Sequence, residues 1–327
     1  MTRLTNSFLD DVNLICVVTP DVGETVRRYA DALGIGPWEV FDFAPPLNRD
    51  MKVGGVACDY AMRVAFGSMG SMGWALLEPQ QGPTIYADFL RHCGSGVHHV
   101  AFSHGRSSHA RCIELFKERG YPVAQEGHWH GHYCYFGSRS TTHLVLELVE
   151  NPDATLPEPL YRYPLRSGEA EGRVRSLSNG FLDRTLSIGI VTDDLDEAVR
   201  LYADELGIGP WAIYEGEALE GPPRTARARH AVARTGSFVW EIIEPGRTSS
   251  IFRDFLDRRG PGVHHVGVDA SQLSYEECRR TFEERGCGLL AESSLGPARS
   301  GYFATEECAG TVFKLFESGE FPTLPET

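Results

Sequence analysis

Two adjacent histidines occur twice in this 327-residue chain and are the residues best suited to chemistry. The pentapeptide Gly-Val-His-His-Val stands at 96–100 and returns at 262–266. An imidazole changes its charge near neutral pH, so it can move a proton or bind a metal. Because each pair lies in an apolar run after a glycine, we predict a strand whose side chains alternate between two faces. His99 and His265 would then point into their barrels, and His98 and His264 would point outward.

Three further histidines stand close together in the first copy. His128, His130 and His132 are spaced two residues apart, which on a strand would project all three to one face. The corresponding part of the second copy, residues 294–300, contains none. We expect His130 and His132 to supply acid or base groups and His128 to contact a substrate. A solvated loop is the alternative.

Other side chains of the first copy are candidates for contacts with a substrate. Four of the five methionines fall between residues 51 and 72, where flexible thioethers either line a pocket for a flat ligand or fill the core. In the strand expected at 143–149, a histidine, a valine and a glutamate alternate onto one face. The residues expected to contact a substrate, besides His128, are Met51, Met62, Tyr135 and His143.

The elements that would position these residues repeat along the chain, and a long-period repeat indicates duplicated structural units. Residues 29–38 match residues 202–211, an offset of 202 − 29 = 173. The His-His segments are offset by 262 − 96 = 166. The difference of seven residues falls between Trp38 and Trp74, where the first copy has a longer loop at 45–51. Surface loops tolerate such insertions.

Each copy contains the order strand, helix and three strands twice. Alternating β-branched runs predict strands, and apolar residues spaced by three or four predict helices. In the first copy the predicted strands are 12–18, 60–66, 73–79, 96–100, 131–136 and 143–149, and the helices are 22–33, 85–90 and 107–119. We therefore predict an α+β protein in which four βαβββ units form two tandem half-open β-barrel domains. The predicted boundaries are 8–150 for the first domain, 151–180 for a Pro-, Gly- and Ser-rich linker and 181–320 for the second domain.

The composition argues against several classes of partner. The 31 Lys and Arg residues against 45 Asp and Glu give a formal net charge of −14, so the average field repels phosphate backbones and anionic membranes. No apolar run approaches the roughly 18 residues of a membrane-spanning helix. The eight cysteines include no C-x-x-C pair, which favours reduced thiols. These features predict a soluble cytoplasmic protein that binds neither nucleic acid nor membrane.

The tandem βαβββ units resemble the vicinal oxygen chelate superfamily, which includes glyoxalase I, methylmalonyl-CoA epimerase, extradiol dioxygenases and bleomycin-resistance proteins. The resemblance rests on Gly-Ile-Gly-Pro-Trp after the first helix and on Gly-Val-His-His-Val at the start of the second unit. It covers nearly all of residues 8–150 and 181–320 and is closest in pattern to the epimerase-like members. Because this scaffold hosts several reactions and plain binding proteins, it implies the fold and leaves the reaction open.

The resemblance also implies where a divalent metal would be held, with one ligand from the first and one from the last strand of each paired unit. The corresponding positions are Leu14, Ala75, His99 and Glu147 in the first domain and Ser187, Glu241, His265 and Lys314 in the second. Each domain therefore keeps two of four ligands. The candidate metal ligands are His99 and Glu147 and, with less support, Glu241 and His265.

Two protein ligands hold a divalent cation weakly, and an ammonium group opposes it. We expect Lys314 to pair with Glu241 and the second barrel to have lost its metal. The histidines of 128–132 could complete a site for Mn, Fe, Co, Ni or Zn in the first barrel, and a metal-free site is equally consistent with the sequence. If units were exchanged between barrels, Glu241 would instead converge with His99 and Glu147.

The sequence therefore predicts an enzyme with its site in the first domain, while the second domain supports it or forms a homodimer interface. It would abstract a proton beside the carbonyl of a small aromatic or keto-acid substrate, as an isomerase, epimerase or lyase. Glu147 would be the base or a metal ligand, and His99 a ligand or the group that polarises the enolate oxygen. One alternative is a metal-free protein that sequesters a small molecule. The other is an extradiol-type dioxygenase, although both opening strands lack its first histidine.

Overall fold

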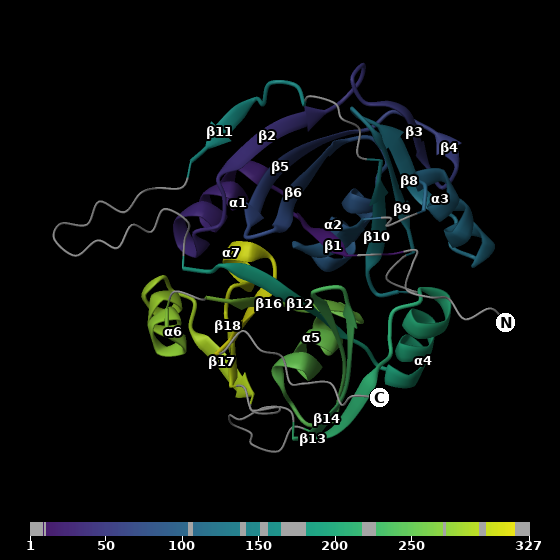
Figure 1. The fold of residues 1–327 in the computed structure, drawn as a ribbon. Helices are drawn as coiled ribbons and strands as arrows, with labels where there is room; N and C mark the ends of the chain where they lie inside the picture. The colour runs from purple at the N-terminus through teal and green to yellow at the C-terminus, as the bar shows by residue number, and fades with distance from the viewer. Residues whose placement is uncertain are drawn as a thin grey trace.

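The computed structural model describes residues 9, 11–103, 107–137, 142–150, 156–164, 181–217, 227–270, 273–293 and 299–317. Within these ranges the chain forms two sheets, each curled around a concave face (Figure 1). Helices pack against each sheet. The predicted α+β architecture is confirmed. Among the described helices, none is both long enough and apolar enough to cross a bilayer.

The first sheet contains two consecutive βαβββ units. The first unit comprises β1 (Val12–Val18), α1 (Val22–Arg28), the π-helical turn η1 (Tyr29–Leu33), β2 (Trp38–Phe43), β5 (Ala61–Met69) and β6 (Met72–Gln81), and is followed by α2 (Ile85–Cys93). The second comprises β7 (Gly96–Phe102), α3 (His109–Glu118), β8 (Val123–His128), β9 (His132–Phe136) and β10 (Val145–Val149). β1 joins them, because it pairs in parallel with β6 and antiparallel with β7.

The second sheet repeats this plan. Its first unit comprises β12 (Arg184–Val191), α4 (Leu195–Arg200), η2 (Leu201–Glu205), β13 (Ala212–Glu217), β14 (Arg227–Thr235) and β15 (Phe238–Pro245), followed by α5 (Ile251–Arg259). Its second comprises β16 (Gly262–Asp269), α6 (Tyr275–Glu284), β17 (Leu289–Ser293), β18 (Ser300–Phe303), α7 (Glu306–Ala309) and β19 (Val312–Phe316). Consecutive units pair within each sheet, so the exchanged arrangement is wrong and Glu241 and His99 lie in different sheets.

Two segments that we expected to be loops contain strands. β3 (Arg49–Val53) begins in the inserted loop and, together with β4 (Val56–Ala57), extends the first sheet beyond β8. β11 (Tyr161–Tyr163), in the expected linker, pairs with β2 at the opposite edge. Both additions use sheet edges, where unpaired backbone groups can accept another strand. Residues 151–155 and 165–180 of that linker lie outside the described part of the chain.

Both His-His strands depart from simple alternation. The register of β7 against β1, and of β16 against β12, shifts by one residue at the first histidine of each pair. As a result the two imidazoles of each pair face each other, with Nδ1 atoms 2.9 Å apart for His98 and His99 and 3.1 Å apart for His264 and His265. The prediction that His98 and His264 point out of their barrels is wrong, because a β-bulge interrupts the alternation.

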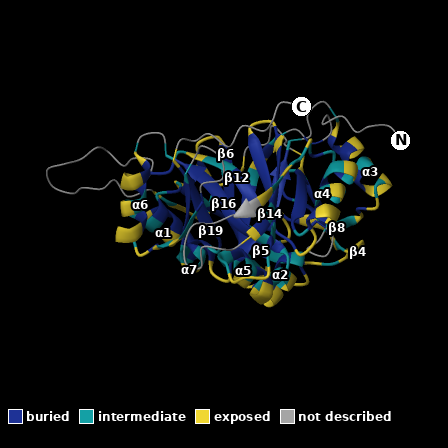
Figure 2. Ribbon diagram, turned by 90° about the horizontal axis from the view of Figure 1, so that it is seen from below, coloured by how far each residue is buried: buried dark blue, intermediate teal, exposed yellow. Residues whose placement is uncertain are grey.

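The two sheets pack against each other through their outer faces. One apolar cluster contains buried residues from both halves, and the rings of Phe102 and Trp240 stack across it with centroids 5.8 Å apart. Equivalent tyrosines of the two copies, Tyr29 and Tyr202, each donate a hydrogen bond of 2.7 Å to a backbone carbonyl of the other half. In Figure 2 the strands are largely buried and most exposed residues lie on the helices around them.

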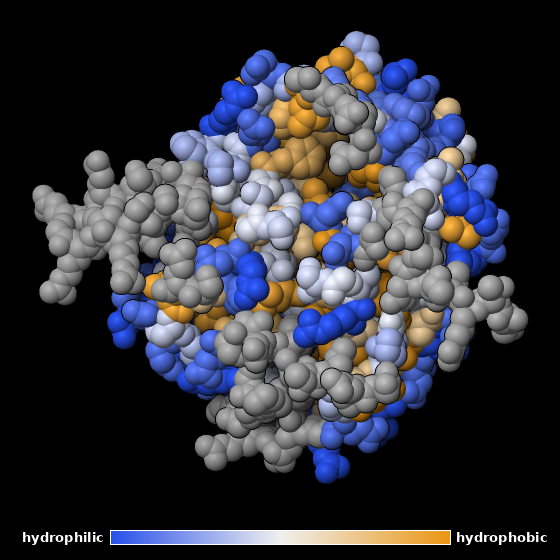
Figure 3. Space-filling view, in the orientation of Figure 1, coloured by the Kyte–Doolittle hydropathy of each residue, from blue (hydrophilic) through white to orange (hydrophobic). Residues whose placement is uncertain are grey.

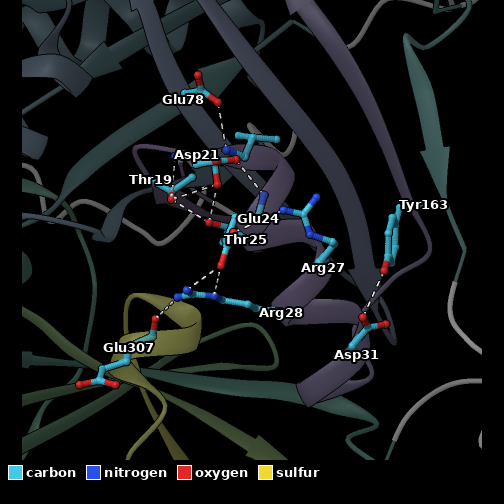
Figure 4. Close-up of polar contacts among 11 residues, drawn as sticks. Thr19, Asp21, Glu24, Thr25, Arg27, Arg28, Asp31, Glu78, Tyr163 and Glu307 are labelled. Carbon is cyan, nitrogen blue, oxygen red and sulfur yellow. Dashed lines mark hydrogen bonds and ion pairs between the residues drawn. The ribbon is translucent and has the colours of Figure 1, made fainter.

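Helix α1 shows how the local sequence and the other half together fix one element (Figure 4). Asp21 caps its N-terminus by accepting a hydrogen bond of 2.8 Å from the backbone N–H of Glu24, as expected from a Thr-Pro-Asp start. Near its other end, Arg28 donates a hydrogen bond of 2.6 Å to the backbone carbonyl of Glu307 on α7. The helix therefore begins at a local signal and is held by a residue far away in the sequence.

Candidate functional site

The concave face of the first sheet encloses a cavity of about 940 Å³. Side chains of β1, β5, β6, β7, β9 and β10 line it, together with the turn between β8 and β9. Figure 3 shows hydrophobic residues around a hollow in the upper half of the molecule, where Figure 1 places these strands. Cavities of this size bind small organic molecules.

His99 on β7 and Glu147 on β10 meet inside this cavity. Nε2 of His99 lies 3.3 Å from Oε2 of Glu147, and the two side chains are 2% and 9% exposed. Their strands are neighbours and run in parallel, so both side chains emerge on the concave face. The structure thus brings together the two candidate ligands that the family resemblance implied for the first domain.

His98 is a hydrogen-bond partner of His99 inside the barrel. Burial, and next the proximity of His99, lower the pKa of His98 well below its usual value, so this ring is neutral and has one N–H. Nδ1 of His98 lies 2.9 Å from Nδ1 of His99, so one of these two nitrogens donates a hydrogen bond to the other. Nε2 of His99 is left to face the Glu147 carboxyl group.

Two other groups touch this pair. Burial, followed by the Glu147 carboxylate and the Tyr86 hydroxyl, raises the pKa of Tyr135 well above its usual value, so the phenol stays protonated. Cys16 on β1 is opposite His99, and burial together with Glu147 raises the pKa of its thiol. Tyr135 lines the cavity as predicted. Cys16 was not predicted, although its place in the first strand, two residues after Leu14, would have indicated the same face.

An aromatic wall forms the opposite part of the cavity. Trp129, in the turn between β8 and β9, stacks on Phe43 with ring centroids 3.8 Å apart. Its indole Nε1 is buried and has no hydrogen-bond partner among the described residues. A buried donor without a partner costs free energy unless a water or ligand accepts from it. Trp129 was not predicted, although a large apolar ring between His128 and His130 is the signal in the sequence that could have indicated it.

The charge of the lining is negative. Its acidic residues are Glu147 and Glu150, and the described residues that line the cavity include no lysine and no arginine. A carboxylate or phosphate entering this cavity would lose its hydration without gaining a cation. The cavity therefore favours an uncharged or cationic ligand.

The three closely spaced histidines do not share one face. Residues 128 and 132 are opposite each other across a β-hairpin, and His130 stands in its turn with φ 57°. His130 lines the cavity, whereas His132 contacts His109 on α3 outside it. The prediction of one strand carrying all three side chains is wrong, because Trp129, His130 and Gly131 reverse the chain. At these residues a β-hairpin turn forms in place of the continuous strand that was predicted.

The remaining predicted contact residues are spread over three places. Met62 lines the cavity. Met51 is buried in an apolar cluster that also contains Met62, and its sulfur accepts a hydrogen bond from the side-chain amide of Asn48. His143 precedes β10 in a left-handed conformation, and its Nε2 lies 3.2 Å from the hydroxyl of Thr192 in the other half. It therefore lies at the junction of the two halves. Because β10 begins only at Val145, His143 does not share a strand face with Glu147 as predicted.

The equivalent positions of the second sheet form a closed polar network. Nζ of Lys314 lies 2.6 Å from Oε2 of Glu241, as predicted. The other carboxylate oxygen accepts a hydrogen bond of 3.0 Å from Ser187 and lies 3.4 Å from Nε2 of His265. Burial by itself would raise the pKa of Glu241. Lys314 and then His265 lower the pKa by more than burial raises it, so the carboxylate is ionised. All four residues are buried.

Glycines in the second sheet allow this network to close. Gly189 replaces the cysteine of the first copy, 16 + 173 = 189, and a Cβ there would lie 1.9 Å from the ring of His265. A Cβ at Gly267 would lie 2.1 Å from the hydroxyl oxygen of Ser187. The polar side chains thus occupy space that side chains of β1 and β7 fill in the first copy. The two His-His strands consequently have different surroundings.

The first cavity does not fit the four-ligand metal site that the resemblance implies. Leu14, Ala75, His99 and Glu147 line the same cavity, but the first two carry no donor atom. Two ligands leave a divalent cation weakly held. A histidine could have replaced them from the hairpin, yet only His130 of the three faces the cavity. The residues at these four positions therefore do not provide the donor set of the implied metal site.

The comparison with protein families agrees with this geometry. The model of the Glyoxalase/Bleomycin resistance protein/Dioxygenase superfamily matches residues 14–136 and 187–305. The chain belongs to this superfamily. The two matched segments contain the equivalent strands β1 and β12 at their starts, which is the duplication seen in the sequence. A search of curated proteins found none that matches significantly.

Solved structures share the tandem arrangement at low sequence identity. A triple mutant of 4-hydroxymandelate synthase from Streptomyces coelicolor matches with a TM-score of 0.63 and 14% identity, over 96% of this chain and 95% of that chain. A xylose isomerase-like TIM barrel/4-hydroxyphenylpyruvate dioxygenase fusion protein matches with a TM-score of 0.56 and 13% identity, over 99% of this chain and 51% of that one. Methylmalonyl-CoA epimerase from Mycobacterium tuberculosis matches 42% of this chain and 89% of its own, with 22% identity and a TM-score of 0.35. At these identities the first two matches show the fold alone.

Proposed function

We propose that the first half is an enzyme that moves a proton at a carbon next to the carbonyl of a small, uncharged aromatic substrate, as an isomerase, epimerase or lyase. The observation that carries this proposal is the buried Glu147–His99 pair, whose facing atoms lie 3.3 Å apart and which lines the cavity. A base in a partly dry site is a stronger proton acceptor than the same base in water.

The reaction assigns a role to each group around the cavity. The Glu147 carboxylate takes the proton, the electron pair of the broken C–H bond forms a carbon–carbon double bond, and the π pair of the carbonyl moves to its oxygen. The unpartnered Nε1–H of Trp129 donates a hydrogen bond to that oxygen and stabilises the enolate. Return of the proton to carbon completes an isomerisation or epimerisation, and loss of a neighbouring leaving group completes a lyase reaction. The hydrogen bond between the Nδ1 atoms of His98 and His99 orients the His99 ring.

The substrate class follows from the lining. Ring walls such as Phe43 and Trp129 suit a flat aromatic group, while the absence of lysine and arginine among the described lining residues disfavours a keto acid. Of the two classes that the sequence left open, we therefore infer the aromatic one. An aryl ketone should bind about tenfold or more tightly than the same ketone bearing a carboxylate.

The test is exchange of the α-proton for deuterium. The purified chain is incubated in deuterium oxide with a panel of aryl alkyl ketones, and loss of the α-proton signal is followed by NMR. Glu147→Gln keeps the size of the side chain and removes the base, so exchange should fall by about 100-fold or more. Glu114→Gln is the matched control, because Glu114 is an exposed residue of α3 that pairs with Arg111.

The outcomes separate the two best candidates. Exchange by the wild type that survives Glu147→Gln would contradict the assignment of the base. Tight binding of an aryl ketone without exchange in any variant would favour the second candidate, a metal-free protein that sequesters a small molecule, which the apolar cavity also suits. The extradiol-type dioxygenase has less support, because Leu14 stands where its first histidine would be.

A further inference from the structure

Three metal-ligating side chains meet outside the cavity, between α3 and β9. They are His109, His132 and Cys134, and one ligand atom from each lies within 4.8 Å of the others. Nε2 of His109 is 2.9 Å from Nδ1 of His132. His109 and Cys134 are buried and His132 is half-buried. Strand alternation explains the pair on β9, since residues 132 and 134 share the face that α3 covers.

A carboxylate orients this cluster. Oε2 of Glu126 lies 3.2 Å from Nε2 of His132, and its other oxygen is 2.7 Å from Nζ of Lys52. The ammonium group of Lys52 at this distance favours the ionised form of the Glu126 side chain. This carboxylate therefore accepts the Nε2–H of His132, which leaves the Nδ1 lone pair directed at His109. The same carboxylate–histidine arrangement fixes the tautomer of histidines that bind metals.

We propose that His109, His132 and Cys134 bind one transition-metal ion of the Zn²⁺ type on the outer face of the first sheet. Two imidazole nitrogens and a thiolate select Zn²⁺ or Co²⁺ over Mg²⁺, Ca²⁺ or Mn²⁺. Three protein ligands are one short of a closed tetrahedral site, so a water would take the fourth position.

Metal binding releases one proton, because the thiol proton of Cys134 passes to solvent as a metal–sulfur bond forms. The proton between the two histidines moves to the outer nitrogen of His109, and two metal–nitrogen bonds form. Tetrahedral ligands about 2.0–2.1 Å from a metal are about 3.3 Å apart. The two imidazole nitrogens, now 2.9 Å apart, would have to separate by a few tenths of an ångström.

The position of the site suggests what it does. On β9 the side chains alternate, so Tyr133 and Tyr135 line the cavity while His132 and Cys134 face α3. A bound ion would join α3 to the hairpin whose turn holds Trp129 over the cavity. It would stabilise the wall of the cavity without touching a substrate.

The experiment is a titration of metal-free protein with Co²⁺, followed by absorption. One equivalent should bind and give a thiolate-to-cobalt charge-transfer band together with the intense visible bands of a tetrahedral site. Cys134→Ser should remove the charge-transfer band, His109→Gln should weaken binding, and Glu126→Gln should raise the Kd about 10–100-fold. Circular dichroism of each metal-free variant checks that it is folded.

Two control variants locate the ion. His128→Gln removes a ring that stacks on His132, with centroids 4.6 Å apart, but is not one of the three ligands. His99→Ala removes the cavity histidine, and both variants should bind one equivalent with the wild-type spectrum. The proposal fails if the wild type shows no charge-transfer band, if the band persists in Cys134→Ser, or if His99→Ala abolishes binding. Should Cys134→Ser not fold, His109→Gln and Glu126→Gln decide, and wild-type affinity in both overturns the proposal.

Discussion

Replacing Lys314 by methionine should destabilise the second half severely. The ammonium lies 2.6 Å from Glu241, and the two side chains are 7% and 5% exposed. Lys314→Met keeps the apolar stem and removes the charge, which leaves the carboxylate buried without its counter-ion. Breaking a buried pair in this way costs about 3–5 kcal/mol. Urea denaturation at pH 7 should show this loss as a lower midpoint with an unchanged slope.

The loss should depend on pH in a defined direction. In the wild type the pKa of Glu241 is lowered, so its contribution is present above the usual carboxyl pKa of about 4.5 and is lost as the pH falls through the folded value. In Lys314→Met the lone buried carboxylate should have a raised pKa, so protonation at low pH relieves it. The difference between the two proteins should therefore narrow between pH 7 and pH 4.

Two comparisons make this prediction refutable. Lys52→Met breaks a pair of nearly equal length, 2.7 Å, but with the lysine 46% exposed, so water replaces the lost partner and little stability should change. Adding Glu241→Leu to Lys314→Met removes the stranded charge and should recover at least half of the loss. If Lys314→Met were as mild as Lys52→Met, or if the difference did not narrow in acid, the buried-pair reasoning would be wrong.

Two other predictions concern the histidine of β14 and the missing metal ligands. Burial, and then Lys314, lower the pKa of His230 to about 4, so the free energy of unfolding should fall as the pH drops from about 6.5 to about 4. In urea denaturation His230→Phe should lose about 3 kcal/mol less than the wild type over that range. A pH profile unchanged from that of the wild type would contradict this. Leu14→His combined with Ala75→Glu supplies two donors beside His99 and Glu147. This double variant should retain about one more equivalent of Mn²⁺ than the wild type after dialysis, whereas equal retention would show that the four positions do not converge.

The sequence by itself determined the architecture. Strand and helix periods depend on neighbours along the chain, so β1 was predicted from residues 12 to 18 with its observed bounds. The repeat then specified two equivalent halves. The family resemblance, and not the repeat, matched His99 with Glu147 and Glu241 with Lys314, and the structure brings each pair into contact.

Only the tertiary structure decided where the other histidines point. The bulge at His98 exists because β7 pairs with β1 out of simple register, and the turn at His130 exists because β8 and β9 pair with each other. Both depend on a partner strand, which the local pattern does not contain. For the same reason His132 lies against α3 and not in the cavity. The two His-His strands are alike in sequence, but the residues that face them from neighbouring strands differ. His99 therefore lines an open cavity, whereas His265 belongs to a closed network with Glu241 and Lys314.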